Sequence, residues 1–428
     1  MRIAVIGTGI AGNAAALGLS KHHEVVLFET RHRAGGHSAT VDINYDGAMI
    51  AVDTGFIVYN ELNYPLLTAL FAHLGINTES SDMSFGVSIG RGRTEWSGAS
   101  LAAVFAQKRN IARPRFLWML REIVRFNRQC LADLDAGRLA GLSLGDYLAQ
   151  RRFGRSFVED YLVPMGSAIW STPDAAMADF PAESFVRFFR NHRLVHYERP
   201  VWRTVSGGSR NYVERLLHSI DAELRLGDGV VGVRREADHV SVRTRSGLVD
   251  RFDHVVFASH TDQTLAMIEN PTVDEIGLLG AIRYRPNQVY LHRDVALMPK
   301  RRAVWSSWNY LREEEGGAAS VTYWMNRLQN LCPNRPLFVS LNPATPPRDD
   351  LTFGVFEYDH PQFDADALAA QAALPTIQGR NRSWFCGAWT GFGFHEDGLR
   401  SGLAVAEALG GAVPWAVPQA QVAAEAAE

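Results

Sequence analysis

The sequence predicts an α/β fold in two parts: a discontinuous domain around a parallel sheet, and an inserted α+β domain with a mixed sheet and helices. Three observations lead to this prediction. A glycine-rich loop lies between two short apolar runs near the N-terminus, strand-length apolar runs recur later, and a long helical stretch separates them. With 428 residues, 46% of them hydrophobic and 21% charged, the chain has room for two or three globular domains.

The first thirty residues carry the strongest signal. Residues 3–6 are an apolar run suited to a buried parallel strand, and they lead into the glycine-rich loop of residues 7–12. A helix is expected over residues 13–20, and a second buried strand over residues 25–28 ends at Glu29. This strand, loop, helix and strand together predict a Rossmann-type dinucleotide-binding domain.

Each residue of the loop has an expected role. Gly7 permits the tight turn, Gly9 lets a pyrophosphate approach the backbone, and Gly12 lets helix and strand pack closely. The N-terminus of the following helix offers unpaired N–H groups and a positive dipole end to the phosphates, and Ile10 and Ala11 in the loop are expected to contact the cofactor.

The end of the second strand has an expected role in binding ribose. Glu29 is placed to accept hydrogen bonds from a ribose diol, and its charge disfavours a 2′-phosphate. Thr30 and Arg31 follow it and are expected to contact the same ligand. The alternative interpretation of the whole region is a glycine-rich turn that binds no ligand.

The residues that follow distinguish between dinucleotides. Arg31 and Arg33 precede Gly35-Gly36-His37, and Asp53-Thr54-Gly55 comes later. Here the sequence resembles the flavin-containing amine oxidase and phytoene desaturase superfamily of FAD oxidoreductases. His37 stands where that superfamily usually has Arg. The resemblance implies an FAD cofactor whose pyrophosphate and flavin side run along the Gly-Gly loop. Two glycines permit close backbone approach, and arginines suit phosphates.

The C-terminal part resembles the closing signature of the same superfamily. Residues 384–389 are expected to form a buried strand and a loop that includes Gly387 and Ala388. A helix beginning near Gly398, with Asp397 and Leu399 beside it, would direct its positive end at the pyrimidine edge of the flavin. The alternative is an ordinary helix that Asp397 caps.

A third segment lies in mid-chain. A glycine pair precedes an expected helix through Leu217, and a β-meander is expected over residues 224–226, 230–233, 239–243 and 255–257. The resemblance implies that Val230 and Val231 hold adenine by backbone contacts. It also implies that the strand ending at Ala258 returns to the cofactor.

The predicted domains follow from these segments. The FAD-binding domain is expected to comprise residues 1–60, 200–284 and 375–415, and the substrate domain residues 61–199 and 285–374, with a flexible tail at 416–428. In the substrate domain we expect helices over 64–74, 116–134, 144–150 and 157–163, and strands over 288–292, 303–308, 320–325, 337–341 and 353–358.

The expected chemistry is hydride removal from a carbon held against the flavin. The substrate is either an amine or a hydrocarbon chain. Amine oxidases of this superfamily usually keep a lysine near the flavin, but none lies near residues 286–288, and His395 stands where a cage aromatic is expected. His395 is our candidate for an acid or base, with a usual pKa near 6.5. The alternative is a histidine that orders its loop. His260, His292 and Glu357 are weaker candidates.

A finer resemblance points to a lipid. Residues 55–60, 323–329 and 385–402 resemble a bacterial subgroup that is often encoded beside methylases similar to cyclopropane-fatty-acid synthases. This implies desaturation of a methylated fatty acyl chain of a phospholipid, with the methylase as a partner. Two alternatives stay open, namely an amine oxidase of a small amine and a non-catalytic flavoprotein that assists the methylase.

Composition limits the other classes of function. A net charge of -3 gives no basic field for nucleic acid, and three distant cysteines provide neither a metal-binding spacing nor a disulfide set. No apolar run reaches the roughly 18 residues of a membrane span, and no signal peptide is recognisable. We therefore expect a cytoplasmic protein without a metal.

One segment predicts contact with the inner face of the membrane. On a helix from residue 116, Arg121, Arg125 and Arg128 share one face, and an apolar stripe of Leu117, Leu120, Val124 and Leu131 marks another. A basic amphipathic helix can lie on anionic lipid. The alternative is a solvated basic face over an apolar stripe that packs in the core.

Overall fold

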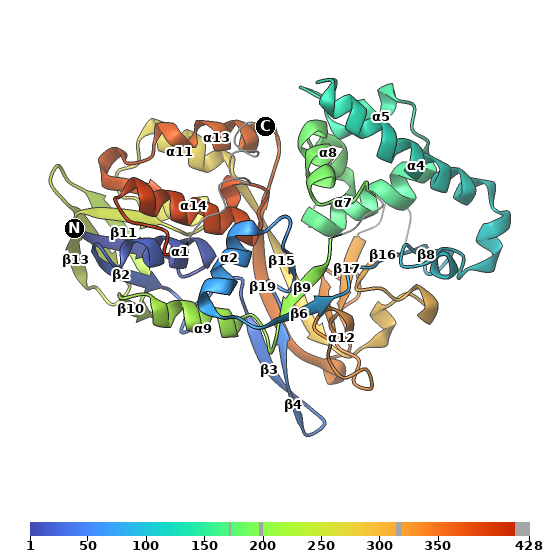
Figure 1. Ribbon diagram of the computed structural model, residues 1–428, viewed down its shortest axis with the longest axis horizontal. Coiled ribbons are helices and arrows are strands. Elements are labelled where there is room, and N and C mark those ends of the chain that lie inside the picture. The colour runs from blue at the N-terminus through green and yellow to red at the C-terminus, as the bar shows by residue number, and fades with distance from the viewer. Residues whose placement is uncertain (171–172, 197–199, 314–318, 416–428) are drawn as a thin grey trace.

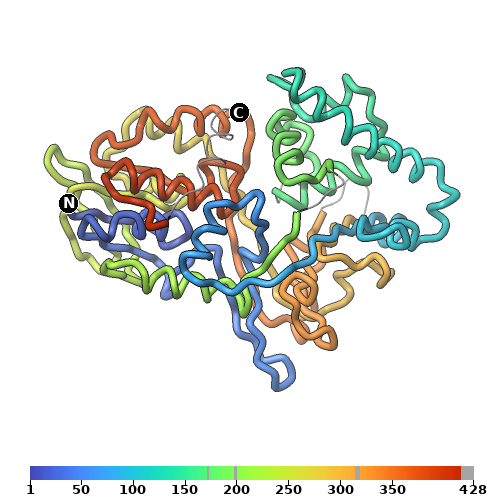
Figure 2. The backbone as a smooth tube through the Cα atoms, viewed as in Figure 1, coloured from blue at the N-terminus to red at the C-terminus, as the bar shows by residue number. Residues whose placement is uncertain are grey.

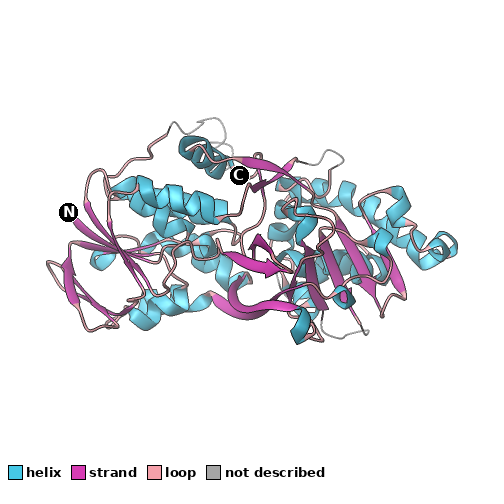
Figure 3. Cartoon of the chain, turned by 90° about the horizontal axis from the view of Figure 1, so that it is seen from below, coloured by secondary structure: helices cyan, strands magenta, loops and turns pink. Residues whose placement is uncertain are grey.

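The computed structural model describes residues 1–170, 173–196, 200–313 and 319–415 (Figure 1). The expected flexible tail at 416–428 lies outside the described residues. Figure 1 shows two lobes, one holding both ends of the drawn ribbon and the other holding α4, α5, α7 and α8. In Figure 3 the strands form one group beside the N-terminus and a larger group in the other lobe. The predicted α/β fold with a parallel and a mixed sheet is confirmed.

A five-stranded parallel sheet forms the centre of the first lobe. All three predicted segments of the dinucleotide domain contribute strands to it, because its order is β10-β2-β1-β14-β20. Every pairing between these strands is parallel. The strands are β1 (Arg2–Ile6), β2 (Glu24–Glu29), β10 (Glu223–Leu226), β14 (His254–Phe257) and β20 (Ser383–Phe385).

The predicted β-meander is only partly right. Residues 224–226 and 255–257 join the parallel sheet, because their register pairs them with β2 and β1. The three-stranded antiparallel sheet instead includes a strand that was not expected, β13. Its strands are β11 (Val230–Arg235), β12 (Val240–Thr244) and β13 (Val249–Phe252).

Helix α1 (Ile10–Leu19) packs against α14 (His395–Ala408), with α2 (Pro65–Leu74) and α9 (Arg210–Ser219) beside them. The contact between α1 and α14 is close. A Cβ at Gly402 would lie 2.1 Å from the carbonyl oxygen of Ala11, and a Cβ at Gly18 would lie 2.7 Å from Cβ of Ala406. Helix α14 also begins three residues before the predicted start at Gly398.

The predicted domain boundaries differ from the packing in three places. Helix α2 packs its apolar face into the core of the first lobe, although residues 61–199 were assigned to the substrate domain. Helix α13 (Ala365–Ala373) also packs there. The hairpin of β3 (Thr40–Tyr45) and β4 (Ala48–Asp53) packs on the large sheet instead. In each case the element belongs to the lobe against which its apolar face packs, and this is not the lobe that its position in the chain suggests.

A seven-stranded mixed sheet forms the base of the second lobe. Strands β16 and β7 pair in parallel, and the other neighbours are antiparallel. Strands β7 and β8 come from a region that was expected to be mostly helical. In order across the sheet the strands are β19 (Thr352–Gln362), β15 (Arg283–His292), β18 (Phe338–Leu341), β17 (Ala319–Trp324), β16 (Trp308–Arg312), β7 (Phe85–Ile89) and β8 (Thr94–Ser97).

The predicted strand over residues 303–308 is wrong. Arg302–Val304 is a 3-10 turn, and the next residues form a loop in which Ser306 N–H donates to Asn309 Oδ1 at 2.9 Å. Buried polar side chains in this stretch bond to the backbone of the loop, so β16 begins only at Trp308.

The expected helices of the second lobe are present and cover the large sheet. The chain leaves the first lobe after α2 and returns along β9 (Figure 2). No helix in the described part of the chain is long and apolar enough to cross a membrane. The other elements are α3 (Leu101–Val104), α4 (Pro114–Asp135), α5 (Leu144–Gln150), α6 (Arg155–Phe157), α7 (Val163–Trp170), α8 (Ala182–Asn191), β5 (Tyr59–Asn60), β6 (Thr78–Ser81), β9 (Trp202–Val205), α10 (Thr261–Met267), α11 (Val273–Ala281) and α12 (Met325–Leu328).

The close contact of α1 and α14 predicts a specific stability effect. We expect Gly402→Ala to lower the free energy of unfolding by about 1–3 kcal/mol, because the added methyl overlaps the Ala11 carbonyl. Gly277→Ala in α11 is the matched control, since its Cβ meets no atom within 4 Å and alanine favours a helix by about 1 kcal/mol. Urea unfolding measures both. Equal or higher stability of Gly402→Ala would contradict the packing.

Candidate cofactor site

The glycine-rich loop joins β1 to α1 and is closed on one side and open on the other. A Cβ at Gly7 would lie 2.7 Å from the Ala258 carbonyl oxygen, and one at Gly12 would lie 1.9 Å from the Gly7 carbonyl oxygen. Gly7 also has φ +106°, which favours glycine. At Gly9, by contrast, a Cβ would meet no atom within 4 Å. Gly7, Gly12 and Ala258 therefore close the loop, and Gly9 presents its open side.

Among the described residues, no side chain caps the N-terminus of α1. Gly9 is the N-cap and offers no side-chain acceptor, and the first turn contains no acidic residue. The N–H groups of the first turn, which include Ile10 and Ala11, have no acceptor within the helix. An uncapped N-terminus beside an open glycine fits a phosphate group.

Glu29 lies buried at the end of β2, as predicted. Its Oε2 accepts the Thr8 hydroxyl at 2.6 Å, and its Oε1 accepts the Arg31 N–H at 3.0 Å. The carboxylate keeps further lone pairs for a ribose hydroxyl. Its position beside the glycine-rich loop therefore fits the expected role, which remains a prediction.

The turn between β10 and β11 packs on the residues after Glu29. Gly227 N–H donates to the Arg31 carbonyl at 2.9 Å, and a Cβ at Gly229 would lie 2.5 Å from the Thr30 hydroxyl. Val230 thus starts β11 next to the end of β2, as expected for an adenine site. Val231 is 39% exposed, so its side chain points to solvent.

The Gly-Gly loop lies against the glycine-rich loop. Gly35 N–H donates to the Thr8 carbonyl at 2.9 Å, and Gly36, at φ +56°, faces the Cα of Gly9. The expected phosphate role of Arg33 needs correction, because its guanidinium donates to the carbonyl of Gly36 at 3.0 Å and orders this loop. Arg31 has an exposed side chain.

His37 occupies a group of aromatic rings on the far side of the Gly-Gly loop. Its ring centroid lies 5.2 Å from that of Tyr358, 5.9 Å from that of His360 and 6.0 Å from that of His260. Burial, followed by the neighbouring histidines, lowers the pKa of His37 well below its usual value. His37 is therefore neutral at pH 7. It does not supply the positive charge of the arginine that the superfamily usually has at this position. Its Nε2 has no partner among the described residues.

Asp53 was expected to contact the cofactor, and its hydrogen bonds assign it a structural role instead. It accepts Ser209 N–H at 3.0 Å, the Ser209 hydroxyl at 2.8 Å and the Gln329 amide at 2.9 Å. By accepting these bonds, Asp53 caps the start of α9 and ties the hairpin to the end of α12. Thr54 bonds the Tyr358 hydroxyl at 2.8 Å, and the absence of a Cβ at Gly55 leaves room for the His37 carbonyl.

The first turn of α14 contains two acids that bind backbone N–H groups. Asp397 accepts from Phe392 and Phe394, each at 3.0 Å, so it caps α14 from the third helical position. Glu396 accepts from Leu66 at 2.8 Å and Leu67 at 3.0 Å and thereby caps α2. Burial raises the pKa of Glu396 to about 7. Sequence reasoning missed Glu396 because its partners are 330 residues away.

Residues around this turn lie where α14 meets α1. A Cβ at Gly398 would lie 2.8 Å from Cγ2 of Ile10 and 3.5 Å from the nitrogen of Ala388. Gly387 N–H donates to the Ser401 hydroxyl at 3.0 Å, and Leu399 is buried. Gly387, Ala388, Gly398 and Leu399 thus lie together beside Ile10.

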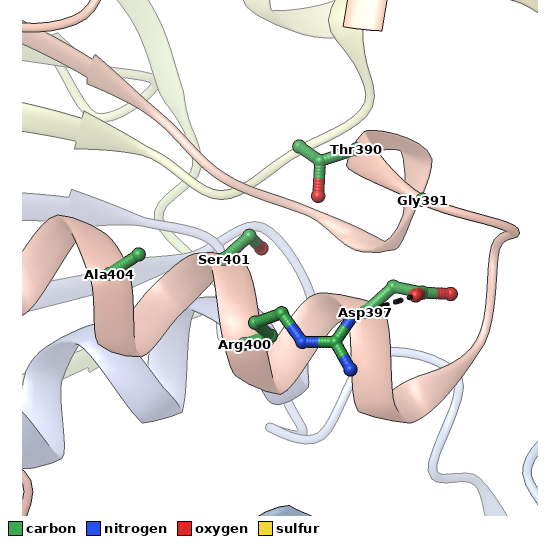
Figure 4. Close-up of a pocket in the computed structure, with 6 residues that line it drawn as sticks. All are labelled: Thr390, Gly391, Asp397, Arg400, Ser401 and Ala404. Carbon is green, nitrogen blue, oxygen red and sulfur yellow. Dashed lines mark ion pairs between the residues drawn. The ribbon is translucent and has the colours of Figure 1, made fainter. Parts of the chain in front are cut away.

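A surface pocket borders the same helical turn (Figure 4). It is lined by Thr390, Gly391, Asp397, Arg400, Ser401 and Ala404. Asp397 lies 3.8 Å from Arg400 across this pocket. The acid is therefore balanced by an arginine and by backbone donors, and adds little free negative charge to the site.

His395 is the first residue of α14, and not part of the preceding loop as predicted. Its ring stacks on Phe56 with centroids 3.8 Å apart, and its Nε2 lies 2.9 Å from the Ser38 hydroxyl and 3.1 Å from that of Tyr212. Burial lowers the pKa of His395 to about 3. The imidazole is therefore neutral near pH 7, and the expectation that it titrates there is corrected. Its partners are hydroxyls of distant segments, whereas Glu396 or a backbone carbonyl was the expected alternative.

Aromatic side chains from two elements lie beside His395. Phe188 on α8 stacks on Phe394 at 5.3 Å and on His192 at 3.8 Å, and Phe392 packs at its edge. Burial lowers the pKa of His192 to about 4, so this group carries no charge near neutrality. All three lysines of the chain have exposed positions elsewhere: Lys21, Lys108 and Lys300.

The weaker catalytic candidates lie apart from this group. His292 is fully buried in β15, with Nε2 2.8 Å from the Ser340 hydroxyl, which fits the core role expected for it. His260 stacks on Tyr284 with centroids 4.3 Å apart. Glu357 has an exposed side chain on β19.

Comparison with known proteins identifies the family. Residues 10–285 match the family described as flavin containing amine oxidoreductase. The chain belongs to this family. Its members contain flavin, and the open loop at Gly9, the uncapped start of α1 and the buried Glu29 fit FAD. No curated protein sequence matches the chain.

Three solved structures illustrate the shared fold of this flavin oxidoreductase family. Putrescine oxidase bound to putrescine has 15% identity and a TM-score of 0.66, covering 96% of this chain and 99% of the other. A fatty acid isomerase from P. acnes that produces CLA has 14% identity and a TM-score of 0.67, covering 95% of this chain and 98% of the other. Cyclohexylamine oxidase from Brevibacterium oxydans has 16% identity and a TM-score of 0.64, covering 96% of this chain and 99% of the other.

The open side of Gly9 predicts a variant that separates cofactor binding from folding. We expect Gly9→Ala to fold with an unchanged melting temperature of the apoprotein, because its Cβ meets no protein atom and its φ of -67° suits alanine. The methyl would occupy the space before α1, so FAD should bind at least about tenfold more weakly. Flavin absorbance per protein and an FAD titration measure this. Gly12→Ala, which should unfold the loop, is the comparison, and full FAD retention by Gly9→Ala would contradict the assignment.

Proposed function

We propose that this FAD-dependent oxidoreductase removes a hydride from an apolar substrate, and that the substrate is a methylated fatty acyl chain of a phospholipid. In the proposed desaturation one carbon gives a hydride to the flavin, its neighbour releases a proton to solvent, and a double bond forms between them. The family membership supports the oxidoreductase class, and the substrate is our own proposal.

The observation that carries the proposal is the lack of free charge around His395. His395 stacks on Phe56 and His192 stacks on Phe188, both imidazoles are neutral near pH 7, and the neighbouring acids bind backbone N–H groups. Transfer of a hydrocarbon chain from water into such surroundings is favourable, because its apolar surface leaves water. A cationic amine would lose its hydration without gaining a counter-ion.

The amine alternative has support from the fold alone. Putrescine and cyclohexylamine oxidases share it, and so does a fatty acid isomerase at similar TM-score. Two features of this chain favour the lipid. No lysine lies beside His395, and the exposed face of α4 is basic, which repels polyamines.

The chain's own groups would position the substrate. Bound FAD supplies the hydride acceptor. His395 is held between the Phe56 ring and the hydroxyls of Ser38 and Tyr212, so its imidazole keeps one orientation. Because the ring stays neutral, we infer that it acts as a hydrogen-bonding and packing group and not as a base that titrates near pH 7.

The proposed substrate places the reaction at the inner face of the cytoplasmic membrane, beside the methylase that would supply the methylated chain. This also keeps open the third alternative, a flavoprotein that assists such a methylase without catalysis. Reduction of its flavin by a substrate separates the two, since a non-catalytic partner has no substrate that reduces it.

Anaerobic absorbance of the purified holoenzyme tests the proposal. We expect phospholipid with methylated acyl chains, dispersed in detergent, to bleach the flavin band, and a panel of small amines to leave it unchanged. Bleaching by an amine alone would establish the amine oxidase instead. A flavin that responds to neither would favour the non-catalytic partner.

His395→Gln is the matched variant for this experiment. Glutamine keeps a hydrogen bond to Ser38 or Tyr212 and cannot titrate, so the pH dependence of bleaching between pH 6 and 8 should equal that of the native enzyme. His395→Ala should slow bleaching, because the ring no longer packs on Phe56. A pH inflection that disappears in His395→Gln would contradict the neutral role.

A further inference from the structure

Helix α4 exposes an apolar face to solvent. Its buried side includes Phe116, Met119 and Phe126, whereas Leu117, Trp118 and Val124 are 44%, 49% and 44% exposed. The alternative of an apolar stripe packed in the core holds for Leu120 and Leu131 but not for Leu117 and Val124. Large apolar side chains grouped on one exposed helix face indicate a surface that contacts something.

The same face carries basic side chains. Residues Leu117, Arg121, Val124 and Arg128 follow one another at spacings of four, three and four, so they share one side of the helix. Arg121 lies over the Trp118 ring, 4.7 Å from its centroid. Apolar and cationic groups are thus interleaved, which is typical of helices that lie on lipid headgroups.

Arg125 does not take part, although the sequence grouped it with Arg121 and Arg128. Its guanidinium donates to Glu122 Oε1 at 3.0 Å and to the Arg151 carbonyl at 3.3 Å, and it lies over the Phe153 ring at 4.0 Å. Arg125 therefore joins α4 to the loop behind it and stays away from the exposed face.

The 3-10 turn before α4 (Lys108–Ala112) extends this surface. Ile111 is 58% exposed, and Lys108 and Arg109 are exposed beside it. Within the described residues no ion pair connects Lys108, Arg109, Arg121 or Arg128 to an acid. The nearby acids Glu159 and Asp160 already pair with Arg115. The surface is therefore positively charged.

We propose that this face, the α4 surface, docks on an anionic phospholipid bilayer. It consists of Lys108, Arg109, Ile111, Leu117, Trp118, Arg121, Val124 and Arg128. The charge complementarity favours lipid phosphate, and the tryptophan with three aliphatic side chains suits the boundary of headgroups and acyl chains. Docking would bring the enzyme to the phospholipid substrate of the proposed function. It rests on the proposed function only for the reason why the protein would bind a membrane.

One helix connects the α4 surface to the residues around His395. Helix α8 packs on α4, where Arg190 pairs with Asp135 at 3.2 Å. On α8, Phe188 stacks on Phe394, the residue before His395. Helix α8 thus contacts both α4 and the residue that precedes His395.

Vesicle flotation of the holoenzyme tests the docking. We expect the protein to float with vesicles that contain phosphatidylglycerol, to stay behind with pure phosphatidylcholine, and to be released by salt. Arg121→Glu/Arg128→Glu should lower the bound fraction about tenfold or more. Leu117→Ser/Trp118→Ser should lower it at constant charge, which a purely electrostatic contact would not show.

The matched control is Lys21→Glu/Arg251→Glu, which changes the net charge equally at exposed positions of the first lobe. It should float like the native protein, and all variants should keep their flavin content and melting temperature. Equal flotation of Arg121→Glu/Arg128→Glu and the native protein, or an equal loss in the control, would overturn the proposal. Flotation does not require turnover, so it can succeed even if lipid fails to bleach the flavin.

Discussion

The contact between α1 and α14 is the constraint on which the site depends. It joins a helix from the first twenty residues to one from the last forty, and it is close enough that only glycine fits at Gly402. Because Gly398 packs on Ile10, the two helix N-termini come together at the carboxyl edge of the parallel sheet. The insertions must therefore leave and re-enter this lobe without disturbing that contact, which explains the discontinuous first domain.

Charge around these helix ends follows a simple pattern. Asp53 caps α9, Glu396 caps α2 and Asp397 caps α14, each by accepting backbone N–H groups. Of α1, α2, α9 and α14, α1 alone has no carboxylate among the described residues that accepts a backbone N–H of its N-cap or first turn. The N-terminus left free suits the phosphates of FAD, and the acids bound to backbone leave the aromatic surroundings of His395 without free negative charge.

The sequence predicted correctly those features that depend only on neighbouring residues. The loop at Gly7 to Gly12, the end of β2 at Glu29 and most helices follow from patterns of a few residues. Features that depend on distant partners were missed. The sequence alone suggests that Asp53 contacts a ligand, whereas in the structure its carboxylate accepts hydrogen bonds from Ser209 and Gln329. The low pKa of His395 depends on its burial by Phe56 and Tyr212. The periodicity of α4 identified an amphipathic helix, but which apolar stripe is buried depends on the elements packed against it.

We propose that hydride removal breaks a C–H bond of an acyl chain at the flavin. The most direct test compares anaerobic flavin bleaching by methylated-chain phospholipid with bleaching by the same lipid deuterated at the methylated carbon and its neighbours. We expect flavin bleaching to be several-fold slower with the deuterated lipid, because hydride removal breaks the bond between the carbon and its deuterium. Equal rates for both lipids, or bleaching that an amine produces and neither lipid does, would contradict it.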